Sequence, residues 1–257
     1  MKVKDVMTKN PVFLQDSDFM TQARQVMRDR HFRTMPVVDA KKRVVGILTE
    51  KELLNIYSTK SNVTVQGFTS EFPFVYPEMD MMEAAKLMIE ADMGRVPVLK
   101  SGQDMTLAGL LSVVDIFRNL KPEKIPHKKL HEIMTTDVKT LSPKDNIAKA
   151  WMNMKQTGFS GFPIVKNGEL VGMVTRRNII NAGYARIERE DNQGTKSTMS
   201  PAVEKVMSTP AYSLPSESTI AEAIQAFLKL DVGRISVTND GKLVGIVDRN
   251  DIIKVFI

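Results

Sequence analysis

The chain has 257 residues, of which 42% are hydrophobic, 26% charged and 6% aromatic. This composition is typical of folded globular proteins and excludes a collagen-like or largely disordered chain. Cysteine is absent and histidine occurs three times, which excludes disulfides and a cysteine nucleophile and leaves little material for a zinc site or a histidine-based triad.

The first 57 residues predict one β-α-β-β-α unit. Apolar residues at i, i+3, i+6 and i+7 form the stripe of an amphipathic helix, namely Met20, Ala23, Val26 and Met27. Two β-rich runs follow at 35–38 and 44–48, separated by a polar turn, and a second helix is predicted from about residue 49 to 57.

The same unit recurs along the chain, which is the signature of a repeat architecture. The final phrase of each copy is closely similar: VVGILTEKELL (44–54), LAGLLSVVDIF (107–117), LVGMVTRRNII (170–180) and LVGIVDRNDII (243–253). A start resembling DVMT recurs in three of the four copies, at 5–8, 132–135 and 205–208. We assign the repeats to residues 1–57, 66–120, 130–184 and 203–257.

The repeats are expected to pair, because two short strands and two amphipathic helices cannot bury all their apolar faces alone. The connector at 121–129 contains two prolines and four lysines, so it is the best candidate boundary between two modules, 1–120 and 130–257. A polar insertion at 185–202 separates the last two copies. We expect its first part, ARIERED, to prolong the preceding helix and the rest to form a flexible loop.

The positive charge is concentrated in the connector. The net charge is +6, and the connector alone holds four basic residues and one acidic residue, so the repeats are nearly neutral. This segment is either a solvated hinge or a basic edge facing an anionic partner. No helix-turn-helix, zinc-finger or aromatic-plus-basic sheet motif is present, which argues against a nucleic-acid partner.

A membrane location is not predicted either. No stretch approaches the ~20 apolar residues that a span requires, and the polar N-terminus does not resemble a signal peptide. We therefore expect a cytoplasmic protein with no membrane partner.

A pair of polar residues opens the second helix of every repeat. The pairs are Thr49 and Glu52, Ser112 and Asp115, Thr175 and Asn178, and Asp248 and Asp251. One interpretation is a helix cap worth ~1 kcal/mol, which needs no ligand. The other is a nucleotide clamp, in which the hydroxyl and the free N–H groups face a phosphate and the carboxylate accepts from a ribose diol.

The four units resemble cystathionine-β-synthase (CBS) domains, in the order of their strands, in their xxPV and VVG phrases and in the S/T-x-x-D helix start. The resemblance implies an α/β (α+β) fold in which two repeats pack through their sheets into a Bateman module, with adenosine-type ligands between them. Four repeats in one chain resemble the gamma subunit of AMP-activated protein kinase and prokaryotic stand-alone CBS proteins.

The resemblance implies unequal ligand sites. In the second repeat, Asp115 would hold the ribose diol, while Ser112 and Arg95 would contact phosphate. The fourth repeat keeps Asp251 and Arg234, but Asp248 replaces the hydroxyl and should repel a phosphate. For both arginines the alternative is a salt bridge within the module.

The odd-numbered repeats match the pattern less well. The first has Thr49, but Glu52 is one methylene longer than the usual aspartate. The third has Thr175, but Asn178 lacks the charge, for which Arg176 and Arg177 could compensate by binding phosphate. The alternative for these two arginines is exposure on the helix surface. The resemblance places the adenine near residues 73–75 and 211–214.

We therefore predict a regulatory, non-enzymatic protein that senses an adenine nucleotide (AMP, ADP or ATP) and changes the geometry of its modules. S-adenosylmethionine is an alternative ligand, and no catalytic cofactor or metal is expected. The partner would be another protein or a second copy of the chain. The other hypotheses are an enzyme, and a nucleic-acid-binding or structural protein.

Overall fold

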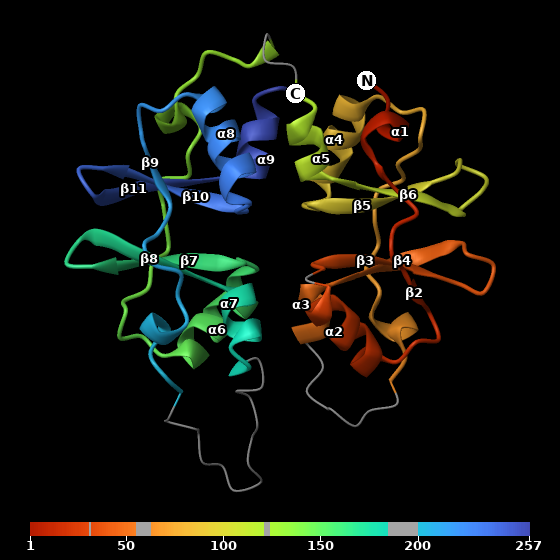
Figure 1. Ribbon diagram of the computed structural model, residues 1–257, viewed down its shortest axis with the longest axis horizontal. Coiled ribbons are helices and arrows are strands. Elements are labelled where there is room, and N and C mark those ends of the chain that lie inside the picture. The colour runs from red at the N-terminus through yellow and green to blue at the C-terminus, as the bar shows by residue number, and fades with distance from the viewer. Residues whose placement is uncertain (31, 55–62, 121–123, 185–199) are drawn as a thin grey trace, which may run out of the picture. The chain divides into compact units, whose positions relative to one another are not determined.

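The computed structural model describes residues 1–30, 32–54, 63–120, 124–184 and 200–257. It divides into two compact units, with residues 1–125 and 253–257 in unit 1 and residues 126–252 in unit 2. Two repeats form most of each unit (Figure 1). The predicted mixture of helices and strands is confirmed.

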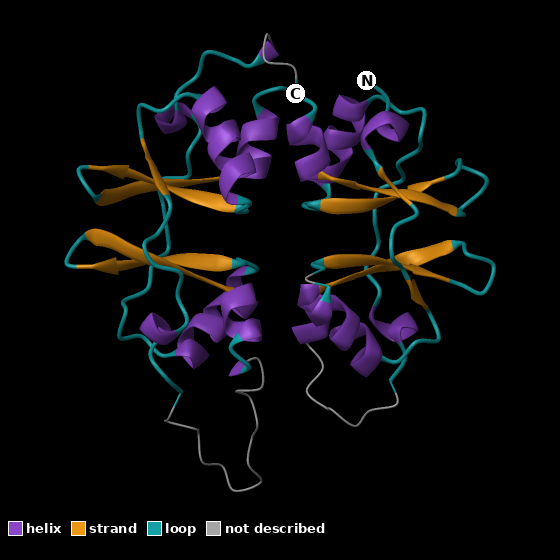
Figure 2. Cartoon of the chain, in the orientation of Figure 1, coloured by secondary structure: helices purple, strands orange, loops and turns teal. Residues whose placement is uncertain are grey.

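The first two repeats share a helix, a β-hairpin and a second helix, and they differ in the elements that precede these. The first contains α1 (Val3–Val6), β1 (Thr8–Lys9), β2 (Leu14–Gln15), α2 (Met20–Asp29), β3 (Thr34–Val38), β4 (Val44–Thr49) and α3 (Glu50–Leu54). The second contains η1 (Val65–Phe68), α4 (Met81–Glu90), β5 (Arg95–Leu99), β6 (Leu107–Ser112) and α5 (Val113–Arg118). In unit 1, two sheets with strand orders β1-β6-β5 and β2-β3-β4 lie between the helices (Figure 2).

The third and fourth repeats follow the same plan. The third contains η3 (Leu130–Glu132), α6 (Ile147–Thr157), β7 (Gly161–Lys166), β8 (Glu169–Thr175) and α7 (Arg176–Asn181). The fourth contains η5 (Val203–Lys205), β9 (Ser213–Pro215), α8 (Ile220–Leu230), β10 (Arg234–Asn239), β11 (Lys242–Asp248) and α9 (Arg249–Lys254). In unit 2 a single pair, Lys242 with Glu169, joins the two hairpins into a sheet with strand order β7-β8-β11-β10-β9.

The predicted helical stripe of the first repeat is buried. Met20, Ala23 and Met27 face a cluster that also contains Leu14 and Val37, and Val26 packs against it. The second helix begins at residue 50, as the pattern predicts within one residue, and its predicted extension from 55 to 57 lies outside the described residues. The expected helical extension in ARIERED also lies outside them.

The segment at the start of each repeat crosses to the other repeat of its unit. In unit 1, β1 pairs antiparallel with β6, so that Thr8 lies opposite Leu110, and Ser70 pairs with Ile47. Unit 2 repeats this exchange through Thr135 with Ile246 and Ser208 with Met173. Each repeat therefore supplies part of its sister's sheet.

The recurring glycines make room for the crossing segments. A β-carbon at Gly46 would lie 2.4 Å from Thr69 Cβ, and one at Gly109 would lie 2.6 Å from Met7 Sδ and 2.9 Å from the Thr8 carbonyl oxygen. In unit 2 the side chains of Met207 and Met134 cover Gly172 and Gly245 in the same way. The close approach, and not an unusual backbone conformation, is what requires glycine at these four positions.

Apolar side chains from both repeats of unit 1 fill the space between their hairpins. Val38 and Val44 of the first repeat form a buried cluster with Leu99 of the second. Five partly buried side chains pack against it: Phe13, Phe72, Tyr76, Met105 and Leu107. Neither repeat supplies the whole cluster, so burial of this surface requires the pair.

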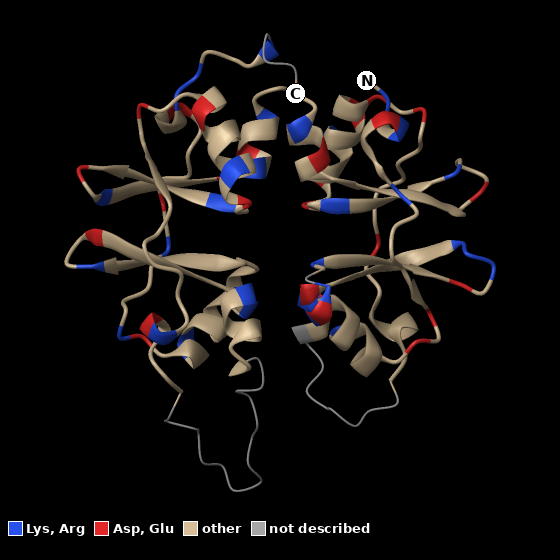
Figure 3. Ribbon diagram, viewed as in Figure 1, with Lys and Arg blue, Asp and Glu red and all other residues tan. Residues whose placement is uncertain are grey.

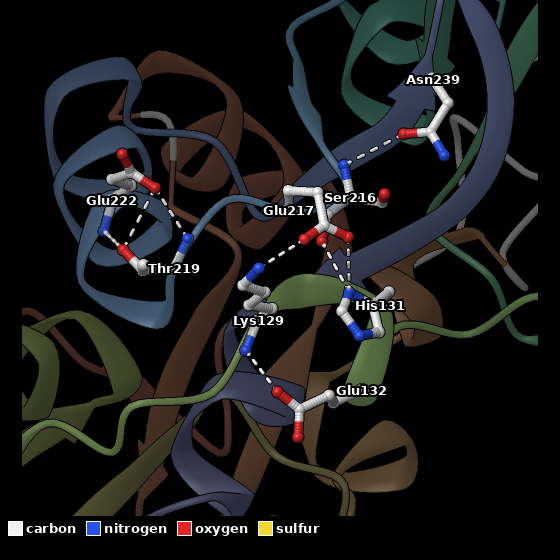
Figure 4. A network of polar contacts seen from close by, with 8 residues as sticks. All are labelled: Lys129, His131, Glu132, Ser216, Glu217, Thr219, Glu222 and Asn239. Atoms are coloured by element: carbon white, nitrogen blue, oxygen red, sulfur yellow. Dashed lines mark hydrogen bonds and ion pairs between the residues drawn. The ribbon is translucent and has the colours of Figure 1, made fainter.

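The first turn of each repeat also docks on the segment that precedes the long helix of its sister repeat. In unit 2, the main-chain N–H of Leu130 donates to the carbonyl oxygen of Ser218, and the main-chain N–H of His131 donates to the carbonyl oxygen of Ser216. The Lys129 ammonium and the His131 ring contact the Glu217 carboxylate beside this junction (Figure 4). The hydrogen bond from Lys129 holds the pKa of Glu217 below its usual range and raises the pKa of Lys129.

Most charged residues lie on helices, in hairpin turns and at strand ends, while the strands are otherwise largely uncharged (Figure 3). Within the described residues, no helix has the length and apolar character needed to cross a membrane.

Replacing a repeat glycine should destabilise its unit. We expect Gly46→Ala to lower the free energy of unfolding by about 1–3 kcal/mol, because Thr69 Cβ can move only with its main chain. Gly67→Ala is the matched control, since nothing lies within 4 Å of its added β-carbon. Urea denaturation of both variants checks this, and equal stability would contradict the role given to the crossing segment.

The contact between Lys129 and Glu217 should give a small, salt-sensitive contribution to stability. Because the folded-state pKa of Glu217 is lowered, this contribution is present at neutral pH and is lost as the pH falls through the folded pKa. We expect Glu217→Gln to lower the melting temperature at neutral pH and low salt, but not at high salt or at a pH below the lowered folded-state pKa of Glu217. A deficit that persists under acid conditions would mean that Glu217 acts through packing.

Candidate functional site

The polar pair of the second repeat forms the start of α5. Asp115 Oδ2 accepts from the main-chain N–H of Ser112 at 2.9 Å and from its hydroxyl at 2.6 Å. The Asp115 N–H in turn points to Ser112 Oγ at 3.2 Å. The pair is thus a capping box. Both contacts of the carboxylate use Oδ2, and no described residue donates a hydrogen bond to the other carboxylate oxygen of Asp115.

The pair of the first repeat has an additional partner. Glu52 Oε2 accepts from the N–H of Thr49 at 2.8 Å and from its hydroxyl. The other oxygen, Oε1, accepts from Ser70 Oγ at 2.8 Å. Ser70 belongs to the segment that crosses from the second repeat, so both oxygens of Glu52 are engaged.

The third repeat has a weaker version of this arrangement. Asn178 Oδ1 accepts from the N–H of Thr175 at 2.9 Å and from its hydroxyl. The Asn178 amide nitrogen lies 3.2 Å from Ser208 Oγ, in the segment that crosses from the fourth repeat. Both partners are neutral here, whereas Glu52 carries a charge.

Two carboxylates meet at the helix start of the fourth repeat. Asp251 Oδ2 accepts from the Asp248 N–H at 2.9 Å, while Asp248 Oδ1 accepts from the N–H groups of Asn250 and Asp251 at 2.8 and 3.1 Å. Asp248 therefore takes over the capping role of the hydroxyl found in the other repeats. It also places a second negative charge beside Asp251, which disfavours an anionic ligand.

The strand register distinguishes even from odd repeats. Arg95 lies directly opposite Ser112, and Arg234 directly opposite Asp248. The corresponding positions hold Thr34 in the first repeat and Gly161 in the third. Directly opposed residues of an antiparallel pair extend on the same face. Each even repeat therefore has an arginine opposite the residue that caps its second helix, whereas the odd repeats have a threonine or a glycine there.

Arg234 contacts the sister repeat within unit 2. Its guanidinium donates to the Gly161 carbonyl oxygen at 3.0 Å and to Ser160 Oγ at 2.6 Å. These contacts tie the start of β10 to the start of β7. A phosphate role for Arg234 stays a prediction, as does that of Arg95.

Arg176 is buried, so the alternative of exposure on the helix surface is wrong for this residue. Its Nη2 donates to the carbonyl oxygens of Met154 and Gly158 at 2.9 and 2.8 Å, at the C-terminal end of α6. A cation at that position stabilises the last carbonyls of a helix. These two contacts hold the Arg176 guanidinium against the end of α6, whereas Arg177 is half-buried.

Sequence reasoning missed the crossing serines, although a signal was present. The residue after the crossing Met or Thr69 carries a hydroxyl in every repeat: Thr8, Ser70, Thr135 and Ser208. The recurrence of the DVMT-like start showed that this position mattered, but not which residue it would meet.

The segments expected near an adenine lie at the edges of the hairpin sheets. Val75 pairs in parallel with Val98, and the main-chain N–H of Leu99 donates to the carbonyl oxygen of Val75 at 2.8 Å. In unit 2, Leu214 of β9 pairs in parallel with Val237. Among the described residues, no group of three or more histidine or acidic side chains is arranged to hold a metal ion.

Comparison with known proteins identifies the family. The CBS domain model matches four segments, residues 3–59, 65–122, 130–184 and 203–257. The chain belongs to the CBS domain family. The resemblance based on the repeated phrases and the predicted α/β fold of four CBS repeats are therefore confirmed. CBS-domain proteins are typically regulatory.

Several relatives share the four-repeat arrangement. Protein MJ1225 of Methanocaldococcus jannaschii, described as a proposed archaeal homolog of g-AMPK, superposes with a TM-score of 0.85 over 100% of both chains at 20% identity. An uncharacterized conserved protein from Pyrococcus horikoshii has a TM-score of 0.72 over 100% of both chains at 23% identity. At these identities the likeness shows a shared CBS fold.

The chain is also similar in sequence to a further relative. The uncharacterized 33.4 kDa protein in the ribosomal RNA operon of Thermofilum pendens is 25% identical over 249 residues, which cover 86% of this chain and 79% of that protein.

Proposed function

We propose that this CBS protein is a regulatory sensor of an adenine nucleotide, AMP, ADP or ATP, and that the helix start of the second repeat is its principal site. The proposed modules are residues 1–120 and 130–257, joined by the linker 121–129. We also propose that the protein acts in the cytoplasm, and that a protein partner or a second copy of the chain reads its state.

The arrangement of Asp115 carries this proposal. Its carboxylate caps α5 through one oxygen, while the other oxygen accepts no hydrogen bond from a described residue. A ribose diol can donate to that second oxygen without dismantling the cap. The ligand contact and the cap are therefore compatible at this residue, and the two interpretations of the sequence pattern need not compete.

Phosphate recognition is assigned to Arg95 and to Ser112, whose hydroxyl must turn from Asp115 Oδ2 to donate to a phosphate oxygen. Arg95 extends on the same face of the hairpin as Ser112, because the two residues are directly opposed in register. A guanidinium recognises phosphate oxygens through paired N–H groups. The helix that begins at Ser112 has only six residues, so we assign recognition to these side chains and not to the helix dipole.

The fourth repeat favours an adenosyl ligand with little negative charge. Arg234 and Asp251 occupy the positions of Arg95 and Asp115, but Asp248 adds a carboxylate where a phosphate would lie. A neutral or cationic adenosyl compound, such as S-adenosylmethionine, meets less repulsion there. We propose that this site distinguishes ligands by charge.

Signalling would follow from population shift. A ligand held by both repeats of a unit stabilises the geometry that it binds best, and a partner that prefers the same geometry then binds more tightly. Ligand contacts at the helix start are suited to this role, because the crossing segment of the sister repeat lies beside each one.

Loss of the Asp115 carboxylate should remove the principal site. We expect AMP, ADP or ATP at ~100 times its dissociation constant to stabilise the wild type by ~2.7 kcal/mol, and Asp115→Ala to lose most of this effect. Thermal shift and calorimetric titration measure it. Glu222→Ala is the matched control, because Glu222 forms the same kind of capping box with Thr219 at the start of α8. Equal binding by Asp115→Ala would refute the assignment, and no response to any adenine ligand would refute sensing.

Removal of the extra carboxylate in the fourth repeat should favour phosphate. In an Asp115→Ala background, we expect Asp248→Ser to tighten AMP binding about fivefold, since like charges ~4 Å apart repel by ~1 kcal/mol in water. Adenosine, which lacks the phosphate, should bind with unchanged affinity. Asp137→Ser, an exposed position in the same unit, is the control, and equal changes for AMP and adenosine would contradict the electrostatic explanation.

A further inference from the structure

Two serines from crossing segments contact the odd-numbered helix starts. Ser70 donates to Glu52 Oε1 at 2.8 Å, and the Asn178 amide donates to Ser208 Oγ at 3.2 Å. Each contact joins the two repeats of one unit. Both serines also pair through their main chains with the strand that precedes the helix, Ser70 with Ile47 and Ser208 with Met173.

The corresponding contact is not made at the second repeat. There the crossing residue is Thr8, and among the described residues no hydrogen bond joins it to Asp115. The difference in side-chain length accounts for part of this contrast, because Glu52 reaches one methylene further than Asp115 toward the crossing segment. The longer glutamate therefore serves both the cap and its sister repeat.

We propose that Ser70 and Ser208 are positioning residues that set the order in which the four repeats bind a ligand. Each serine contacts the side-chain atom that a ribose diol would bind, so a ligand of the first or third repeat must compete with this contact. This inference rests on the proposed function, and it concerns the regulation of the same kind of site.

The contact in the first repeat is the stronger of the two. It has a charged acceptor and lies in a partly buried position, whereas the third repeat joins two neutral groups and its serine is exposed. Hydrogen bonds to charged groups are stronger than those between neutral ones. The Ser208 contact is therefore easier to break than the Ser70 contact. The Ser70 contact is the one that opposes ligand binding in the first repeat.

The test measures the affinity of the first repeat for AMP after removal of the Ser70 hydroxyl, which the second repeat contributes. In an Asp115→Ala background, we expect Ser70→Ala to tighten AMP binding about tenfold, equivalent to ~1.4 kcal/mol. Ser208→Ala should give a smaller gain, and Thr8→Ala, which alters the crossing hydroxyl of the second repeat, should give none. Calorimetric titration gives the affinities of all four proteins.

A second measurement separates the positioning role from a merely structural one. Loss of a hydrogen bond between repeats should speed amide exchange at residue 70, whose main-chain N–H donates to Ile47 at 2.9 Å. The expected signature is therefore tighter ligand binding together with faster exchange. Glu52→Gln keeps an acceptor for Ser70, so it should leave exchange close to that of the wild type.

The outcomes separate this inference from the proposed function. Weaker AMP binding by Ser70→Ala would make Ser70 a ligand contact and overturn the inference, as would unchanged affinity. If AMP binds neither the wild type nor Ser70→Ala, the proposed function fails for this ligand, and unchanged exchange at residue 70 would then overturn the contact itself.

Discussion

The contact on which the structure depends is the approach of each crossing segment to a glycine of its sister repeat. Thr69, Met7, Met207 and Met134 occupy the space that a β-carbon would fill at the four repeat glycines. This approach completes each hairpin sheet with a segment of the other repeat and brings apolar side chains of both into one core. It also fixes the neighbourhood of the candidate sites, because the residue that caps the second helix lies only three positions after the glycine.

The local features of this fold could be predicted from sequence because they depend on neighbouring residues. The stripe from Met20 to Met27 and the capping pairs have periods that a single helix dictates. The crossing of segments could not be predicted in this way, since Ser70 and Ile47 are brought together by the pairing of whole repeats. For the same reason, the pattern at Arg176 could indicate a basic helix start but not its burial against the end of α6.

The four helix starts show how one backbone arrangement supports different chemistry. All four use the side chain at the third helical position to satisfy main-chain N–H groups at the start, and Asp115, Glu52, Asn178 and Asp251 do this with similar geometry. Their remaining atoms differ in charge and reach. Any of these four side chains can accept the main-chain hydrogen bond at the helix start. Exchanges among them therefore change the candidate site without disturbing the fold.

The capping atoms and the remaining side-chain atoms of each helix start differ in how a ligand would affect them. Asp115 can accept a ligand with its second oxygen while its cap and the crossing segment stay in place, so binding there need not move the sister repeat. Glu52 has no such spare oxygen, because Ser70 occupies it. Under the proposed mechanism, occupancy of the second repeat therefore adds stability, whereas occupancy of the first displaces a contact between repeats. A change in module geometry would then follow from the odd repeats, which are the harder ones to fill.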